Sequence, residues 1–119
     1  MNFCCARPVV YFLVMSSKID TFRALVMKDP KNALARYGLA NELIKEERYE
    51  EARSVLLEYL SMHDDEGAAY RLLAAVHEKL GRVEEACEAY RRGVDAARRH
   101  GHPSMAAEFQ AKLEELEDE

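Results

Sequence analysis

Few residues of this 119-residue chain have the type and spacing that chemistry requires. His100 and His102 are separated by one glycine and resemble half of a metal site, but no carboxylate or cysteine stands beside them in the sequence. A zinc site needs three or four convergent ligands. We therefore predict an exposed loop at these histidines, with neither a metal nor a cofactor.

The other reactive side chains fit structural roles better. Cys87 follows a small residue, and its neighbours Glu85 and Glu88 would raise the pKa of the thiol, which disfavours a nucleophile. We expect His77 to be partly buried with its hydrogen bonds satisfied. No glycine-rich phosphate loop, GxSxG or HExxH motif occurs. The sequence therefore predicts a protein that is not an enzyme.

Composition narrows the remaining classes of protein. Hydrophobic residues make up 49% and charged residues 33%, so one domain with a buried core is expected and disorder of the whole chain is not. The net charge of −5 disfavours nucleic acid as a partner. No window approaches the roughly 18–20 apolar residues that span a bilayer, so no membrane partner is expected. Three cysteines without repeated spacing favour a reducing, cytoplasmic location.

An internal repeat defines the elements that must position any binding residues. Residues 48–52, Arg-Tyr-Glu-Glu-Ala, match residues 82–86, Arg-Val-Glu-Glu-Ala, at an offset of 34. The same offset pairs further residues without a gap: Ala35 with Ala69, Leu39 with Leu73, Ala40 with Ala74, Lys45 with Lys79, and Leu56 with Tyr90. One ungapped offset over this length indicates two copies of one structural unit.

Each unit has the apolar spacing of two amphipathic helices. Gly81 can end the first helix of the second unit in a left-handed conformation, and Glu47 at the matching place would bear a modest steric penalty. Asp65 and Ser104 are candidate N-caps for the helices that follow them. The predicted helices cover residues 18–28, 33–46, 49–61, 67–80, 83–99 and 104–117.

This 34-residue helix-turn-helix unit resembles the tetratricopeptide repeat. The family pattern has a bulky residue, a leucine and a small residue in the first helix, and a small and a bulky residue in the second. In the first unit these positions hold Arg36, Leu39, Ala40, Ala52 and Leu56, and in the second Tyr70, Leu73, Ala74, Ala86 and Tyr90. Arg36 replaces the usual aromatic residue, His77 replaces the usual tyrosine, and the closing proline is missing after both units. The resemblance covers about residues 17–117 and implies an all-α, right-handed α-α superhelix with a C-terminal capping helix.

The family resemblance implies a concave groove lined by the first helix of each unit. The residues it places there are Leu34, Tyr37, Asn41, Lys45, Ala68, Arg71, Ala75 and Glu78. Tyrosine and arginine are enriched at interface hot spots, so Tyr37 and Arg71 are the expected anchors. Ordinary surface residues on an array too short to hold a ligand remain the alternative.

Some members of the family clamp the carboxylate of chaperone tails with Asn, Lys and Arg. Only Asn41 fits that set here, and the other places hold Tyr37, Leu72, His102 and Ala106. We therefore expect an apolar or mixed peptide, or a helix, of another protein. The resulting hypothesis is an adaptor or scaffold module, and the alternative is a structural unit that dimerises through its terminal helices.

The first fourteen residues do not fit the repeat pattern. They carry one charge, Arg7, and the apolar run Val9–Val14. Three interpretations remain open: a secretory signal, a segment that packs on the first repeat, or a gene-start artefact upstream of a native start at Met15. We therefore divide the chain into an apolar extension, residues 1–14, and a tetratricopeptide repeat domain, residues 15–119.

Overall fold

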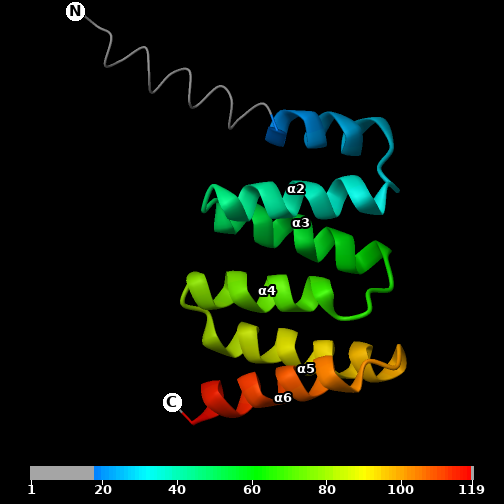
Figure 1. Cartoon of the computed structure of the whole chain (residues 1–119). Coiled ribbons are helices and arrows are strands. Elements are labelled where there is room, and N and C mark those ends of the chain that lie inside the picture. The colour runs from blue at the N-terminus through cyan, green and yellow to red at the C-terminus, as the bar shows by residue number, and fades with distance from the viewer. Residues whose placement is uncertain (1–17, 119) are drawn as a thin grey trace, which may run out of the picture.

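The computed structural model describes residues 18–118, which form a stack of antiparallel helices (Figure 1). The predicted extension over residues 1–14 lies outside the described residues. A first helix covers residues 18–28. It is followed by α2 (Ala33–Lys45), α3 (Tyr49–Met62), α4 (Ala68–Lys79), α5 (Val83–Arg99) and α6 (Pro103–Glu117). The described chain contains no strand, and the predicted helix bounds are confirmed to within one residue.

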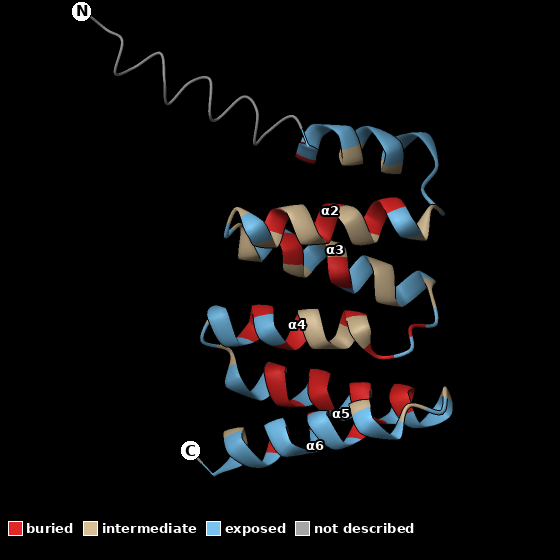
Figure 2. Cartoon of the chain, viewed as in Figure 1, coloured by how far each residue is buried: buried red, intermediate tan, exposed pale blue. Residues whose placement is uncertain are grey.

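The 34-residue offset corresponds to two successive helix pairs, α2 with α3 and α4 with α5. The apolar residues at matching positions are buried in both pairs. Buried stretches mark each of these four helices (Figure 2). Ala52 and Ala86, the small residues of the two second helices, have no exposed surface. These matches confirm the all-α repeat fold and the register of the repeat.

The turn that joins the two helices of each pair has the same geometry in both units. Glu47 has φ 58° and Gly81 has φ 75°, both in the left-handed region. The next residue closes the turn: the N–H of Arg48 donates to the carbonyl of Leu43, and that of Arg82 to His77. The predicted left-handed conformation is therefore confirmed at both turns.

Helix starts are set by capping groups that the sequence only partly predicts. The side chain of Asn32 accepts a hydrogen bond from the N–H of Ala35 at 3.0 Å and caps α2. The prediction of Ser104 as an N-cap is wrong, because α6 begins with Pro103 and His102 occupies the N-cap position. Proline suits the first helical position because its missing N–H would have no helical acceptor there.

Each end of the stack is fixed by a phenylalanine that packs against a glycine. A Cβ on Gly38 of α2 would lie 2.5 Å from the ring of Phe22 in the first helix. A Cβ on Gly93 of α5 would lie 2.8 Å from the ring of Phe109, which is fully buried on α6. Glycine therefore permits the two outer helices to approach their neighbours closely.

Candidate protein-binding face

The structure places the predicted binding residues on α2 and α4, the first helices of the two units. We call the surface they form, together with Glu108 of α6, the groove face. Its predicted members are Leu34, Tyr37, Asn41 and Lys45 on α2, and Ala68, Arg71, Ala75 and Glu78 on α4.

Tyr37 is a half-buried aromatic group near the middle of the groove face. Its ring packs edge-on against the ring of Tyr59, with 5.7 Å between the centroids. Burial raises the pKa of the Tyr37 hydroxyl, Asp65 raises it further, and the charge of Arg71 lowers it. Arg71 occupies the position on α4 that matches Tyr37 on α2, so the two predicted anchors lie on the first helices of successive units.

Arg71 is held in place by α6. Its Nε and Nη2 atoms donate to the two carboxylate oxygens of Glu108 at 2.9 and 2.8 Å. Its guanidinium lies 5.3 Å from the ring centroid of Phe109. This bidentate pair fixes the direction of the planar fork. The sequence did not predict Glu108 as a partner of Arg71, because the two residues are 37 positions apart. Glu108 belongs to α6, which follows α4 at the same offset that separates α4 from α2.

Three other predicted side chains have partners within the chain. The side chain of Asn41 donates to the carbonyl of Tyr37 at 3.2 Å. Lys45 pairs with Glu42 one turn before it, at 3.0 Å. Glu78 accepts a hydrogen bond from the hydroxyl of Tyr90 at 2.8 Å.

The remaining predicted residues are small or fully accessible. Leu34 is 82% exposed at the start of α2. Ala75 is exposed on α4, and Ala68 is half-buried at the start of that helix. The short side chains of Ala68 and Ala75 leave the surface of α4 accessible between its polar residues.

A pocket of about 420 Å³ lies between α4 and α6 at one end of the groove face. It is lined by Arg71 of α4, by Glu108 of α6, and by the segment that leads into α6, including His102, Pro103 and Met105. It combines a charged pair, a thioether and a proline ring, which suits a mixed peptide side chain.

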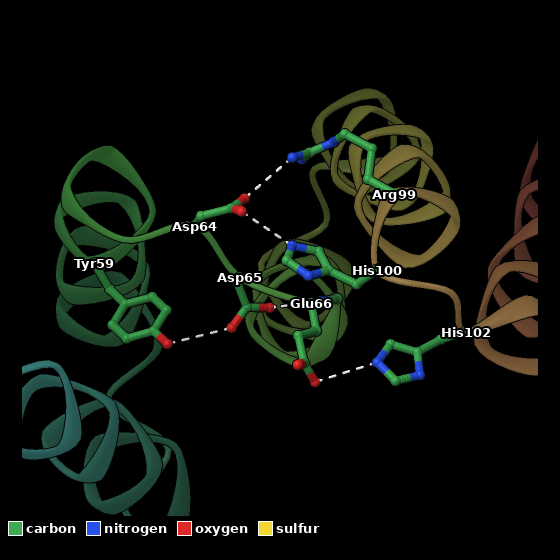
Figure 3. A network of polar contacts seen from close by, with 8 residues as sticks. Tyr59, Asp64, Asp65, Glu66, Arg99, His100 and His102 are labelled. Atoms are coloured by element: carbon green, nitrogen blue, oxygen red, sulfur yellow. Dashed lines mark hydrogen bonds and ion pairs between the residues drawn. The ribbon is translucent and has the colours of Figure 1, made fainter.

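The loop between α3 and α4 is organised by the buried carboxylate of Asp65 (Figure 3). One of its oxygens accepts hydrogen bonds from the N–H groups of Gly67 and Ala69, both at 2.8 Å. The other accepts from the hydroxyl of Tyr59 at 3.2 Å. The prediction of Asp65 as the N-cap is wrong, because Gly67 occupies that position. Asp65 nevertheless stabilises the start of α4 through its hydrogen bonds from Gly67 and Ala69.

Two histidine–carboxylate contacts join the α3–α4 loop to the α5–α6 loop (Figure 3). His100 lies 3.0 Å from Asp64, which also accepts a hydrogen bond from Arg99. His102 lies 3.2 Å from Glu66. The hydrogen bond from Arg99, with the nearby charge of His100, lowers the pKa of Asp64.

These contacts change the description of the histidine pair. The expectation of no adjacent carboxylate is wrong, because the fold brings Asp64 and Glu66 from a loop 36 residues away. Within residues 18–118, however, no group of three or more His, Cys, Asp or Glu side chains is placed to hold a metal ion. The histidines therefore connect two loops of the fold.

The other two reactive residues are buried in the core. Burial raises the pKa of the Cys87 thiol, and the nearby charge of Arg91 only partly offsets this, so the neutral thiol is favoured as predicted. His77 is 4% exposed and its Nδ1 atom has no hydrogen-bond partner. The prediction that its hydrogen bonds are satisfied is therefore wrong for this atom.

The described part of the chain is an array of paired helices that present one continuous face from successive first helices. The tetratricopeptide repeat family model matches residues 14–97. The chain belongs to the tetratricopeptide repeat family. A search of curated proteins finds no match.

Solved structures share this fold. PcrH in complex with the chaperone binding region of PopD is 23% identical, with a TM-score of 0.76 over 94% of this chain and 88% of that chain. Protein BPP2914 from Bordetella parapertussis is 22% identical, with a TM-score of 0.71 over 84% and 87%. MamA from Desulfovibrio magneticus RS-1 is 22% identical, with a TM-score of 0.63 over 92% and 70%.

None of the helices within residues 18–118 has both the length and the apolar character needed to cross a membrane.

Proposed function

We propose that this chain is a protein–protein interaction module that binds a peptide or helix of a partner protein on the groove face. The observation that carries the proposal is that Tyr37 and Arg71 occupy matching positions on the first helices of successive units, and that Arg71 also lines a pocket of about 420 Å³. A single bound segment can therefore contact both residues.

The geometry of both anchors supports tight contact at low entropic cost. The Tyr37 ring is fixed by Tyr59, and the Arg71 fork is fixed by Glu108 and Phe109. Side chains that are ordered before binding lose little freedom when the partner arrives. Glu108 uses one N–H each on Nε and Nη2 of the five that arginine carries, so further donors can serve carbonyl groups of a partner.

The likeness to PcrH supports a peptide ligand in particular. PcrH is solved in complex with the chaperone binding region of PopD, and it shares the fold of this chain with a TM-score of 0.76. We infer a partner segment of mixed polar and apolar character, because the groove face itself is mixed. The proposed role is that of a non-catalytic adaptor or scaffold.

The test begins with capture of partners by the full chain and their identification by mass spectrometry. The dissociation constant of the partner is then measured by calorimetry for the wild type and for Tyr37→Ala with Arg71→Ala. We expect the double change to weaken binding by about 2 kcal/mol or more, a hot-spot magnitude.

A matched control places the same changes away from the groove face, as Tyr49→Ala with Arg98→Ala. Both double variants are checked by circular dichroism and melting, because Tyr37 and Arg71 also pack within the fold. A folded groove-face variant that binds its partner as tightly as the wild type would contradict the proposal.

A second candidate function is self-association through the N-terminal end of the described stack. Met27 of the first helix is 81% exposed, and Leu34, just beyond the connecting turn, is 82% exposed. The apolar face of α6 is less available, since Phe109 and Leu113 are buried in the core. Sedimentation velocity over a range of concentrations tests this candidate: a dimer that dissociates with Met27→Lys and Leu34→Lys supports it, and a monomer at all concentrations contradicts it.

A further inference from the structure

A second pocket lies on the side of α4 that faces away from the groove face. It has a volume of about 190 Å³ and is formed by α3, α4 and α5. Leu73 and His77 reach it from α4, each two residues from the groove residues Arg71 and Ala75. Side chains two positions apart on a helix point in directions that differ by about 200°. The two surfaces are therefore separate.

Two polar atoms at this pocket have no hydrogen-bond partner. The Nδ1 atom of His77 is buried, and so is the Nε atom of Arg53 on α3. Only 4% of the surface of His77 is exposed, so bulk water does not reach its ring. A buried polar atom without a partner is costly, because it has lost its hydrogen bonds to water. A group that bonds to these atoms is therefore favoured, and it reaches them by displacing the partly exposed side chain of Arg53.

Three further charged groups line the pocket from α5: Glu85, Glu88 and Arg92. The Glu85 carboxylate is the one that lies near both His77 and Arg53. Its Oε2 atom lies 3.7 Å from Arg53 Nη2 and 3.8 Å from His77 Nδ1, which is beyond hydrogen-bond distance in both cases. The pocket thus presents one group that can only donate a hydrogen bond, Arg53 Nε–H, and one that can only accept, the Glu85 carboxylate. The Nδ1 atom of His77 donates or accepts according to the tautomer of the ring.

We propose that this pocket binds the side-chain amide of a glutamine or asparagine from a partner protein. The amide oxygen accepts from Arg53 Nε–H, and the amide NH₂ donates to Glu85. Because an amide carries both a donor and an acceptor, it also satisfies either tautomer of His77. The lining carries two arginines, Arg53 and Arg92, and two glutamates, Glu85 and Glu88, so its charges balance and favour a neutral group over a carboxylate or an ammonium. An ammonium group would also leave Arg53 Nε–H without an acceptor.

The rest of the pocket fits the aliphatic part of such a side chain. Leu57, Leu73 and Ala89 line it, and Leu57 is 39% exposed at its mouth. The volume is several times the roughly 30 Å³ that one water occupies in the liquid. Burial also lowers the pKa of His77, which keeps the ring neutral near pH 7.

The test is a titration of the ¹⁵N-labelled full chain, followed by NMR, with three probes of equal length: butyramide, butyrate and butylamine. We expect saturable shifts at the pocket residues with butyramide and a dissociation constant on the order of 10 mM, as fits six heavy atoms. Butyrate and butylamine should bind at least fivefold more weakly. Equal binding of the three probes, or shifts that never saturate, would show that only water fills the pocket and would overturn the proposal.

Variants of the chain locate the binding. His77→Phe keeps an aromatic ring and Arg53→Met keeps an aliphatic stem, and each should weaken butyramide binding at least threefold. Arg98→Met, elsewhere on α5, should leave it unchanged, as should Tyr37→Ala with Arg71→Ala on the groove face. Arg53 is accessible enough for its variant to fold, so unchanged butyramide binding by Arg53→Met would overturn the assignment even if His77→Phe fails to fold.

Discussion

At the scale of single residues, His77 stands at a position where burial and polarity conflict. Desolvation lowers the pKa of its ring, with Arg53 and Arg82 acting in the same direction and Glu85 against them. Where tetratricopeptide repeats usually carry a tyrosine, this chain thus holds a neutral imidazole. A buried group whose charged form is disfavoured makes stability depend on pH.

The first prediction concerns that pH dependence. Because the folded-state pKa of His77 is lowered, the unfolded chain takes up a proton first as pH falls through about 6.5, the ordinary value for histidine. The contribution of the neutral ring to stability is therefore complete above that pH and is lost below it. We expect His77→Phe to lose less stability than the wild type between pH 7.5 and 5.5 in urea unfolding. Equal losses in both proteins would contradict a buried neutral ring.

The second prediction concerns Glu47, whose φ of 58° is costly for a residue with a side chain. Glu47→Gly removes this strain but adds freedom to the unfolded chain, so we expect a net gain of up to about 1 kcal/mol in the free energy of unfolding. Gly81→Ala, at the matching turn with φ 75°, is the reciprocal control and should destabilise the protein. Denaturant unfolding measures both, and a loss of stability in Glu47→Gly would contradict the strain.

At the scale of helices, small residues determine how closely the helices of a unit pack. Ala86 of α5 has no exposed surface, and a larger side chain would separate α5 from its neighbours. We predict that Ala86→Leu lowers the free energy of unfolding by about 1–3 kcal/mol. Ala107→Leu, on the exposed side of α6, is the control and should have little effect. An unchanged melting temperature of Ala86→Leu would contradict the close packing.

Helix positions were predictable from the sequence because they depend on local patterns. The 34-residue offset and the turn residues Glu47 and Gly81 place α2 to α5 within one residue. The contact between Arg71 and Glu108 was not predictable in this way, since it depends on how far α6 rotates against α4. A third first-type helix at the same offset is the signal that could have directed attention to α6.

The loop contacts show the same limit in the candidate site. His100 and Asp64 are 36 residues apart and meet because two loops lie side by side at one end of the stack (Figure 3). Buried His77 was predicted to be satisfied, because periodicity gives the direction of a side chain and does not give the atoms around it. The sequence therefore indicated which face residues occupy, and the structure supplied their partners.

At the scale of the whole molecule, the described core is continuous from the first helix to α6. It begins with Ile19, which is 1% exposed, and ends with Leu113 and the partly buried Leu116. The predicted boundary after residue 14 precedes all of these side chains.

The next prediction tests that boundary. Deletion of residues 1–14 should leave the helical signal and the melting temperature about the same, because the side chains of the described core all follow the cut. Circular dichroism and calorimetry compare the two chains. Loss of cooperative melting in the shortened chain would instead support packing of Val9–Val14 on the first repeat.

The pair between Arg71 and Glu108 has a consequence for the energetics of recognition. The guanidinium that we propose as an anchor for a partner also holds α6 against α4. A ligand carboxylate that takes the Nε and Nη2 edge of Arg71 must release Glu108, so affinity for such a ligand and the opening of the C-terminal helix are thermodynamically linked, each altering the other by the same factor. We therefore expect Glu108→Gln to bind an acidic peptide more tightly and to exchange the amide hydrogens of α6 faster than the wild type does. Hydrogen exchange with and without the peptide measures both sides of this linkage.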